Sequence, residues 1–173
     1  MSLQGSVAFI GFGEAGLAIA ETLAASGRAD GVRAYDIKLD DRDGGAAMRS
    51  RIEDAGLTAS ATAKEAVEGA KIVICVVTAD QAAKAAGAAA RHLAAGALWL
   101  DMNSCAPGTK QIAAGPVNAA GGTYVDVAVM APITPRGHET PMLAASAEPD
   151  SVAARLAEAG LAPRFVGSDI GRA

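Results

Sequence analysis

Short apolar runs alternate with longer, alanine-rich stretches along this chain. The run Lys71–Val77 is the most continuous, and its consecutive β-branched residues predict a strand buried on both faces. In Glu14–Ser26 the apolar residues recur with helical spacing, and glycine follows nearly every such stretch, as is typical where a helix ends. Strands are predicted over Ser6–Ile10, Val32–Tyr35, Leu57–Ala59, Lys71–Val77, Ala97–Leu100, Thr123–Val129, Met142–Ser146 and Arg164–Val166. Helices are predicted over Glu14–Ser26, Ala46–Ala55, the capping box Thr62–Glu65 to Gly69, Thr78 to about Leu93, Pro107 to about Gly121, and from a cap at Asp150 to Gly160.

The order of these elements predicts the fold class. Repeated strand–helix–strand units favour parallel pairing, with the helices packed on the sheet. We therefore expect an α/β fold, a doubly wound, mostly parallel sheet with helices on both faces. The segment from Ala131 to about Pro141 interrupts the pattern, because it contains three prolines and has no clear periodicity. We expect this irregular loop to lie on the substrate side.

Composition and charge narrow the class of protein. With 173 residues, 51% of them hydrophobic, the chain is long enough for one folded domain over residues 1–173. The net charge of -4 and the lack of a basic stripe exclude nucleic acid as an expected partner. The apolar run Leu93–Leu100 is far shorter than the ~18 residues of a membrane span, so we expect no membrane association. Cys75 and Cys105 lie far apart without a histidine cluster, which favours buried thiols in a reducing cytoplasm over a metal site or a disulfide.

A glycine-rich turn is the strongest chemical signal. Residues 11–16 read GFGEAG, which fits GxGxxG, and they lie between a predicted strand and a predicted helix. Gly11 would make the tight turn, Gly13 would let a pyrophosphate approach the backbone, and Gly16 would let the helix pack closely. The motif therefore predicts a dinucleotide site at Gly11–Gly16, and a plain glycine-rich turn is the alternative. We expect Glu14, in the same turn, to act as a cap or to interact with the helix dipole.

The second signal is Asp36, which ends the second predicted strand. A carboxylate at this place can accept hydrogen bonds from both ribose hydroxyls of an adenosine, and it repels a 2′-phosphate. Asp36 therefore favours NAD over NADP as the cofactor. The alternative is that Asp36 only caps a turn, and the nearby Lys38 and Arg42 would weaken the discrimination.

In these motifs the chain resembles the N-terminal domain of the β-hydroxyacid dehydrogenases, a family that includes 3-hydroxyisobutyrate and phosphogluconate dehydrogenases. The resemblance covers nearly the whole chain and implies a Rossmann fold. Four segments carry it: Val7–Gly13, similar to "IGFGxMG" with Ala15 where Met is usual; Cys75–Thr78 with Asp80; Asp101–Ser104 with Pro107, similar to "D-x-S-[ST]-x-x-P"; and Gly167–Ala173, similar to the start of "GxxGxGxxxK".

The resemblance implies an activity and a set of site residues. The parent enzyme would transfer a hydride between NAD and a small hydroxy acid. Beside Gly11, Phe12, Gly13, Glu14, Ala15, Gly16 and Asp36, the cofactor-binding residues would be Val76, Val77, Thr78 and Asn103. Substrate-binding residues would be Ser104, Met130 and Ala131. The family's catalytic lysine would lie beyond Ala173 and its helical C-terminal domain would be absent from this chain, so we expect this chain to be inactive alone and the full-length parent to be a homodimer.

One departure leaves the substrate open. The family's "DAPVSGG" loop reads DVAVMAP here, over Asp126–Pro132. Two other interpretations also stay open: a stand-alone dinucleotide-binding or sensor module, and a methyltransferase with a similar glycine-rich turn.

For the remaining residues we expect structural or solvent-exposed positions rather than a functional role. We expect Trp99 in the core and Lys71 and Lys110 in solvent. His138 would lie in a solvated loop, with substrate binding as the alternative. Cys105 lies beside the candidate site, but nothing pairs with it as a base, so we do not expect a nucleophile.

Overall fold

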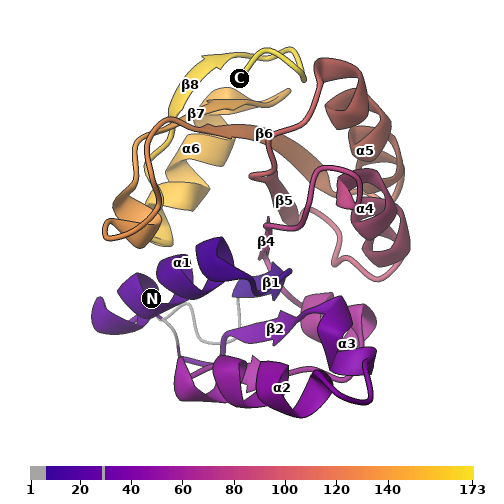
Figure 1. Ribbon diagram of the computed structural model, residues 1–173. Coiled ribbons are helices and arrows are strands. Elements are labelled where there is room, and N and C mark those ends of the chain that lie inside the picture. The colour runs from indigo at the N-terminus through magenta and orange to yellow at the C-terminus, as the bar shows by residue number, and fades with distance from the viewer. Residues whose placement is uncertain (1–6, 29) are drawn as a thin grey trace.

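The computed structural model describes residues 7–28 and 30–173, which form one eight-stranded sheet flanked by helices (Figure 1). The strands are β1 Val7–Ile10, β2 Arg33–Tyr35, β3 Thr58–Ala59, β4 Ile72–Cys75, β5 Leu98–Asp101, β6 Thr123–Val129, β7 Met142–Ala145 and β8 Arg164–Gly167. The helices are α1 Glu14–Ala25, α2 Gly45–Asp54, α3 Ala63–Val67, α4 Ala82–Ala90, α5 Pro107–Ala119 and α6 Pro149–Glu158, with 3-10 turns η1 Ile37–Asp40 and η2 Gly137–Glu139.

The strand order is β3-β2-β1-β4-β5-β6-β7-β8. All neighbouring strands are parallel except β6 and β7, so the mostly parallel, doubly wound α/β fold is confirmed. The order reverses between β1 and β4, whose last residues Ile10 and Cys75 are paired. In open α/β sheets such a reversal opens a crevice at the carboxyl ends of the strands, where ligands bind. The turns after β1 and β4 both lie at this point.

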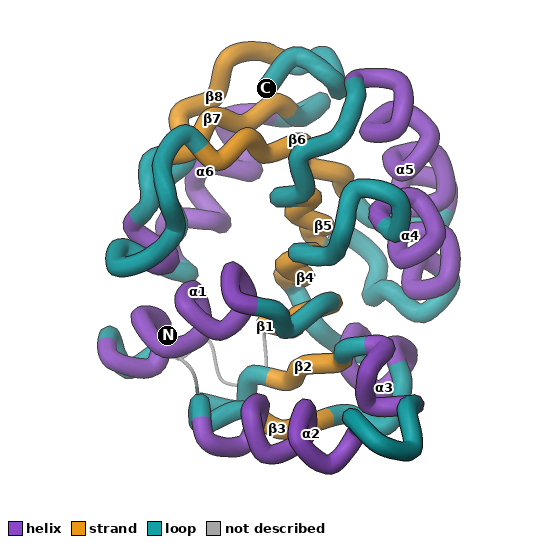
Figure 2. The backbone as a smooth tube through the Cα atoms, in the orientation of Figure 1, coloured by secondary structure: helices purple, strands orange, loops and turns teal. Residues whose placement is uncertain are grey.

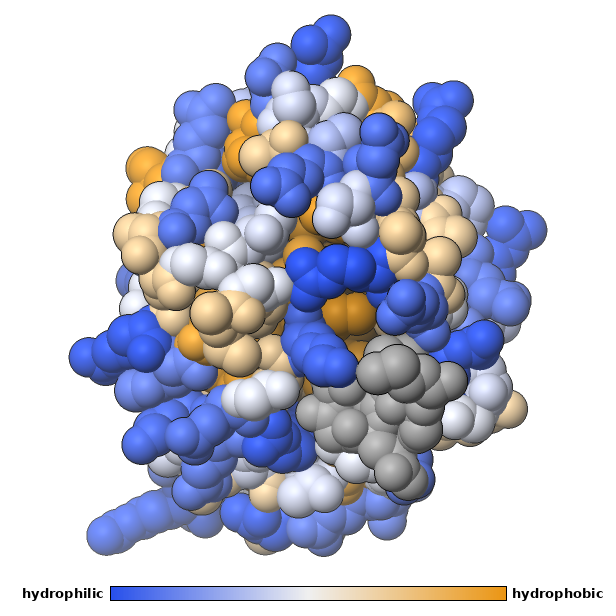
Figure 3. All heavy atoms as spheres, turned by 180° about the vertical axis from the view of Figure 1, so that it is seen from behind, coloured by the Kyte–Doolittle hydropathy of each residue, from blue (hydrophilic) through white to orange (hydrophobic). Residues whose placement is uncertain are grey.

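Apolar side chains fill both faces of the sheet. On one face Phe9, Ile74 and Leu100 pack with apolar residues of α1, α2 and α6. On the other, Trp99 packs with the alanines of α3, α4 and α5, whose small side chains allow close helix packing. Helices therefore cover both faces, as predicted (Figure 2). Trp99 lies in the core, also as predicted. The opposite view of the surface shows mainly hydrophilic side chains, with hydrophobic colour in small separate areas (Figure 3).

Several predicted boundaries shift by a few residues. The strand predicted over Lys71–Val77 is four residues long, and α4 begins at Ala82 rather than Thr78, because a turn with a Gln81 N–H bond to the Thr78 carbonyl precedes it. Thr62 caps α3 as predicted: its hydroxyl accepts from the Glu65 N–H at 3.2 Å. Asp150 is not the N-cap of α6 as predicted: the N-cap residue is Glu148, and Asp150 lies in the first turn of the helix.

The proline-rich segment packs on α1. The N–H of His138 donates to the hydroxyl of Thr22 at 2.9 Å, and its ring Nδ1 lies 2.8 Å from the same oxygen. Gly137 has φ +55°, and a Cβ there would strike Thr22 and the Ala18 carbonyl. The expectation of a solvated His138 is therefore wrong, because Thr22 supplies the polar partner that allows this residue to be buried. Burial lowers the pKa of His138.

Candidate functional site

The glycine turn has the three properties that a phosphate cradle needs. Gly11 has φ +90°, and a Cβ there would overlap the Val76 carbonyl, so the turn passes directly beside the β4–α4 loop. A Cβ on Gly16 would lie 2.9 Å from the Gly11 carbonyl oxygen, so α1 begins close against the turn. A Cβ on Gly13 would meet nothing within 4 Å. The open space therefore lies at the one glycine where a pyrophosphate would approach, and a dinucleotide fits the turn.

The N-terminus of α1 faces the same space. Gly13 is the N-cap residue and supplies no side-chain cap, which leaves the positive end of a 12-residue helix available to an anion. Glu14 is exposed in the first turn, where its charge favours the helix dipole, and Ala15 is half-buried behind it. The ring of Phe12 is fully buried against Phe9, with ring centroids 5.9 Å apart, so Phe12 lines the turn with its backbone only.

Asp36 lies directly beside this turn. Its Oδ2 accepts from the Phe12 N–H at 2.7 Å, and its Oδ1 accepts from the Lys38 N–H at 2.9 Å. The carboxylate thus caps η1, which was the alternative interpretation, and is tied to the glycine turn at the same time. Two N–H donors leave about half of its roughly four acceptor positions open. The half-buried Asp36 therefore has the capacity for further hydrogen bonds from a ligand.

Asn103 joins the loops after β4 and β5. Its Oδ1 accepts from the Val77 N–H at 2.7 Å, while its Nδ2 donates to Asp101 Oδ1 at 2.7 Å and lies 3.5 Å from the Cys75 sulfur. Asn103 is 5% exposed, and both the oxygen and the nitrogen of its side-chain amide form hydrogen bonds within the protein. Asn103 therefore positions the segment that contains Val76, Val77 and the exposed Thr78, which are predicted cofactor contacts.

The predicted substrate residues lie at the same edge of the sheet. Ser104 is exposed in the loop after β5, and β6 runs parallel to β5 and extends beyond it before the exposed Met130 and half-buried Ala131. The N–H of Met130 donates to the Pro141 carbonyl at 2.9 Å, which holds the start of the proline-rich segment.

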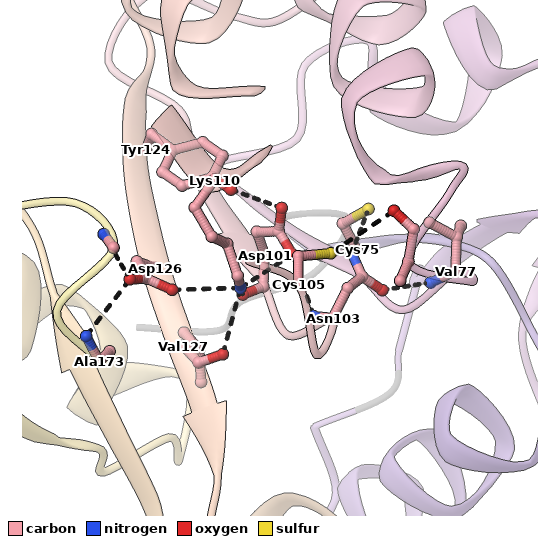
Figure 4. Close-up of polar contacts among 12 residues, drawn as sticks. Cys75, Val77, Asp101, Asn103, Cys105, Lys110, Tyr124, Asp126, Val127 and Ala173 are labelled. Carbon is pink, nitrogen blue, oxygen red and sulfur yellow. Dashed lines mark hydrogen bonds and ion pairs between the residues drawn. The ribbon is translucent and has the colours of Figure 1, made fainter. Parts of the chain in front are cut away.

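A buried charge cluster is the feature that the sequence analysis missed. The ammonium of Lys110 lies 3.1 Å from Asp101 Oδ1 and 3.1 Å from Asp126 Oδ1, and it donates to the Asp101 carbonyl at 2.7 Å (Figure 4). Lys110 is 4% exposed, so the expectation that it is solvated is wrong. The signal was its helical spacing: Lys110 shares the buried face of α5 with Ala113, Ala114 and Val117.

The surroundings of both thiols in this region oppose their ionisation. Burial, with a contribution from Asp101, raises the pKa of Cys75 to about 12. Burial and Asp101 also raise the pKa of Cys105, whose sulfur lies 3.5 Å from the Ala79 carbonyl oxygen. A thiol is a weak nucleophile until it ionises, so neither cysteine has the environment of a reactive one.

Among the described residues, 7–28 and 30–173, no helix is long and apolar enough to cross a membrane. The same residues contain no group of three or more histidine, cysteine, aspartate or glutamate side chains that could hold a metal ion.

Comparison with solved structures supports the fold assignment. A conserved hypothetical protein from Sinorhizobium meliloti 1021 is 34% identical, with a TM-score of 0.89 over 96% of this chain. A conserved protein of unknown function, described as structurally similar to 3-hydroxyacid dehydrogenases, is 25% identical, with a TM-score of 0.77 over 95% of this chain. An imine reductase from Myxococcus stipitatus in complex with NADP+ is 22% identical, with a TM-score of 0.74 over 96%, and shows the fold alone. This chain spans 55%, 58% and 56% of those three chains, respectively.

The sequence comparison assigns the family. No curated protein matches the sequence. The model of the NAD-binding domain of 6-phosphogluconate dehydrogenase matches residues 6–135, a range that contains the glycine turn, Asp36 and Asn103. The resemblance seen in the sequence motifs is thereby confirmed, and this chain belongs to the family of NAD-binding domains of 6-phosphogluconate dehydrogenase.

Proposed function

We propose that residues 1–173 form the NAD-binding domain of an oxidoreductase that transfers a hydride between NAD and a small hydroxy acid. The observation that carries this proposal is the glycine turn: it is closed by Gly11 and Gly16, open at Gly13, and joined to Asp36 through the Phe12 N–H. Bound NAD would supply the hydride chemistry, and the protein supplies binding and orientation.

Three groups of residues would bind three different parts of the cofactor. The backbone of Gly11–Gly16, with the N-terminus of α1, would bind the pyrophosphate through N–H groups and the helix dipole. The free acceptor positions of Asp36 would take the ribose hydroxyls. The segment Val76–Thr78, held by Asn103, would lie along the nicotinamide half, because it follows β4 at the reversal of strand order.

Local charge supports NAD over NADP. Besides Asp36, the segment that follows β2 carries Asp40, Asp41 and Asp43. Asp40 accepts a hydrogen bond from the Tyr35 hydroxyl at 2.7 Å, and burial together with this carboxylate raises the pKa of Tyr35 to about 12. A 2′-phosphate would bring roughly two more negative charges to this acidic segment. Lys38 and Arg42 are on the same segment and reduce the repulsion, so we propose a preference for NAD rather than complete exclusion of NADP.

The proposed substrate side lacks a free proton-transfer group among the described residues of the strand edge. Ser104, Met130 and Ala131 would contact the hydroxy acid, but none of them is a general acid or base at neutral pH. Lys110 is close to this edge, and its ammonium is engaged by the acceptors of Asp101 and Asp126. We therefore propose that this chain binds the dinucleotide without turnover, and that catalysis needs a lysine and a helical domain of the parent enzyme.

Calorimetric titration of this chain tests the proposal. NADH, NADPH and S-adenosylmethionine are titrated separately into the same preparation. Tight binding of NADH, weaker binding of NADPH and no heat from S-adenosylmethionine are the expected results. A preference for S-adenosylmethionine would instead favour a methyltransferase. If this chain binds NADH but no full-length relative shows turnover of a substrate, the results would favour a sensor module.

A further inference from the structure

The buried cluster around Lys110 connects two parts of the chain that are far apart in sequence. Lys110 extends from α5 between the last residue of β5, Asp101, and the middle of β6, Asp126 (Figure 4). Its side chain is 5% exposed, those of Asp101 and Asp126 are 0% and 2% exposed, and the Val127 carbonyl lies 3.4 Å from the ammonium. Lys110 has no open side toward a ligand.

On the cofactor side, the cluster ends at the loop after β4. Asp101 Oδ1 accepts from Lys110 and also from the backbone and side-chain amides of Asn103, at 3.0 and 2.7 Å. Asn103 in turn accepts the Val77 N–H. Tyr124 donates to Asp101 Oδ2; burial and the nearby Asp101 charge raise the pKa of Tyr124, which keeps it a donor. The orientation of Asn103 therefore depends on a carboxylate that Lys110 holds in place.

On the other side, the cluster ends at the segment after β8. Asp126 Oδ1 pairs with Lys110, whereas Oδ2 accepts from the Gly171 N–H at 2.8 Å and lies 3.4 Å from the Ala173 nitrogen. Because Asp126 is 1% exposed, water cannot replace these donors while the cluster is intact. The segment also passes tightly over the start of α5, since a Cβ on Gly171 would lie 2.9 Å from Pro107.

The charges make the two sides interdependent. One ammonium compensates two buried carboxylates, so removing it leaves both without their cation, and a buried ion pair that loses one partner is strongly destabilised. The deficit of positive charge is met by N–H and O–H donors from Asn103, Tyr124 and Gly171. A change on either side therefore alters the hydrogen bonds available on the other.

We propose that Lys110 and Asp126 are positioning residues that couple the nicotinamide-side bridge, Asn103–Val77, to the segment 171–173. The inference rests on the proposed NAD binding and deepens it: a displacement of the 171–173 segment changes how the nicotinamide half of the cofactor is held. The adenosine half is bound at the glycine turn, outside the cluster, and does not depend on it.

The test compares NADH with ADP-ribose, which lacks the nicotinamide. The main variant is Asp126→Asn, because Lys110 and the Gly171 N–H contact different oxygens of Asp126, and an amide replaces one of these oxygens with an NH₂ donor. We expect it to weaken NADH binding about tenfold, to change ADP-ribose binding less than about threefold, and to speed amide hydrogen exchange at Gly171 and Val77. Asn103→Ala should give the same split between the two ligands, and the exposed Lys71→Met should change neither.

The outcomes separate this inference from the proposed function. If the unmodified chain binds neither ligand, the proposed NAD binding fails and the inference fails with it. If the unmodified chain binds both ligands, and Asp126→Asn either weakens NADH and ADP-ribose binding equally or changes neither, only the proposed coupling is overturned. Lys110→Met removes the cation altogether; where it does not fold, as judged by circular dichroism, the Asp126→Asn and Asn103→Ala results decide the question.

Discussion

Gly13→Val tests the phosphate cradle directly. In the protein without ligand the change costs little, because a Cβ at Gly13 meets nothing within 4 Å and the residue has φ -71°, which other amino acids adopt. Valine is a poorer N-cap residue than glycine, which costs about 1 kcal/mol of stability. The branched side chain would instead fill the space that the pyrophosphate needs.

The expected loss of binding is large. A phosphate held by two N–H groups loses two charge-assisted hydrogen bonds, each worth about 1.5–3 kcal/mol. The total of about 3 kcal/mol or more corresponds to a loss of over a hundredfold in NADH affinity. We expect circular dichroism and melting temperature to stay close to those of the unmodified chain.

The matched control is Gly87→Val. Gly87 is exposed on α4 and a Cβ there also meets nothing within 4 Å, but it is not part of the turn. The control should bind NADH normally. A folded Gly13→Val chain whose dissociation constant moves less than about threefold, under ~0.7 kcal/mol, would refute the cradle.

Three further predictions concern specificity, catalysis and pH. Asp36→Ser should narrow the gap between NADH and NADPH affinity because it removes the repelling carboxylate; calorimetry in which the unmodified chain already prefers NADPH would contradict this. Mixed with NAD and a panel of hydroxy acids at pH 7 to 9, the chain should form no reduced nicotinamide, as followed by absorbance, and turnover on the order of 1 s⁻¹ would show that residues 1–173 contain the acid/base group. Burial lowers the pKa of His138 in the folded state, so its contribution to stability is complete above its ordinary pKa of about 6.5 and is lost as the pH falls through the lowered value. Between pH 7.5 and 5, the His138→Gln variant should therefore lose less stability than the unmodified chain, as measured by thermal unfolding. An identical loss of stability in both would exclude this contribution of His138.

Local sequence was sufficient for the order of elements and for the glycine turn. The strands were predictable from short continuous apolar runs and the helices from the 3.6-residue period of their apolar positions, both of which are properties of each segment itself. The turn at Gly11–Gly16 is equally local in its motif and backbone, because the positive φ of Gly11 and the contact of Gly16 with the Gly11 carbonyl lie within one strand–turn–helix unit, whereas the contact of Gly11 with Val76 depends on the neighbouring strand. The capping box at Thr62 was predictable for the same reason.

The tertiary structure decided what depends on neighbouring strands. Lys110 looked like a solvated helix residue, but β5 and β6 bring Asp101 and Asp126 to opposite sides of its ammonium. Asn103 stays a predicted cofactor contact, but its role in holding the loop after β4 could not be read from the sequence, because β4 lies beside β5 and supplies the Val77 N–H that donates to the Asn103 side chain. No spacing in the chain encodes these distances, because they arise only when parallel strands whose paired residues are 25 or 26 positions apart pack side by side. The sequence by itself thus determined which segments form strands, helices and the glycine turn, whereas only the packed sheet decided which charged side chains are buried and which loops they hold together.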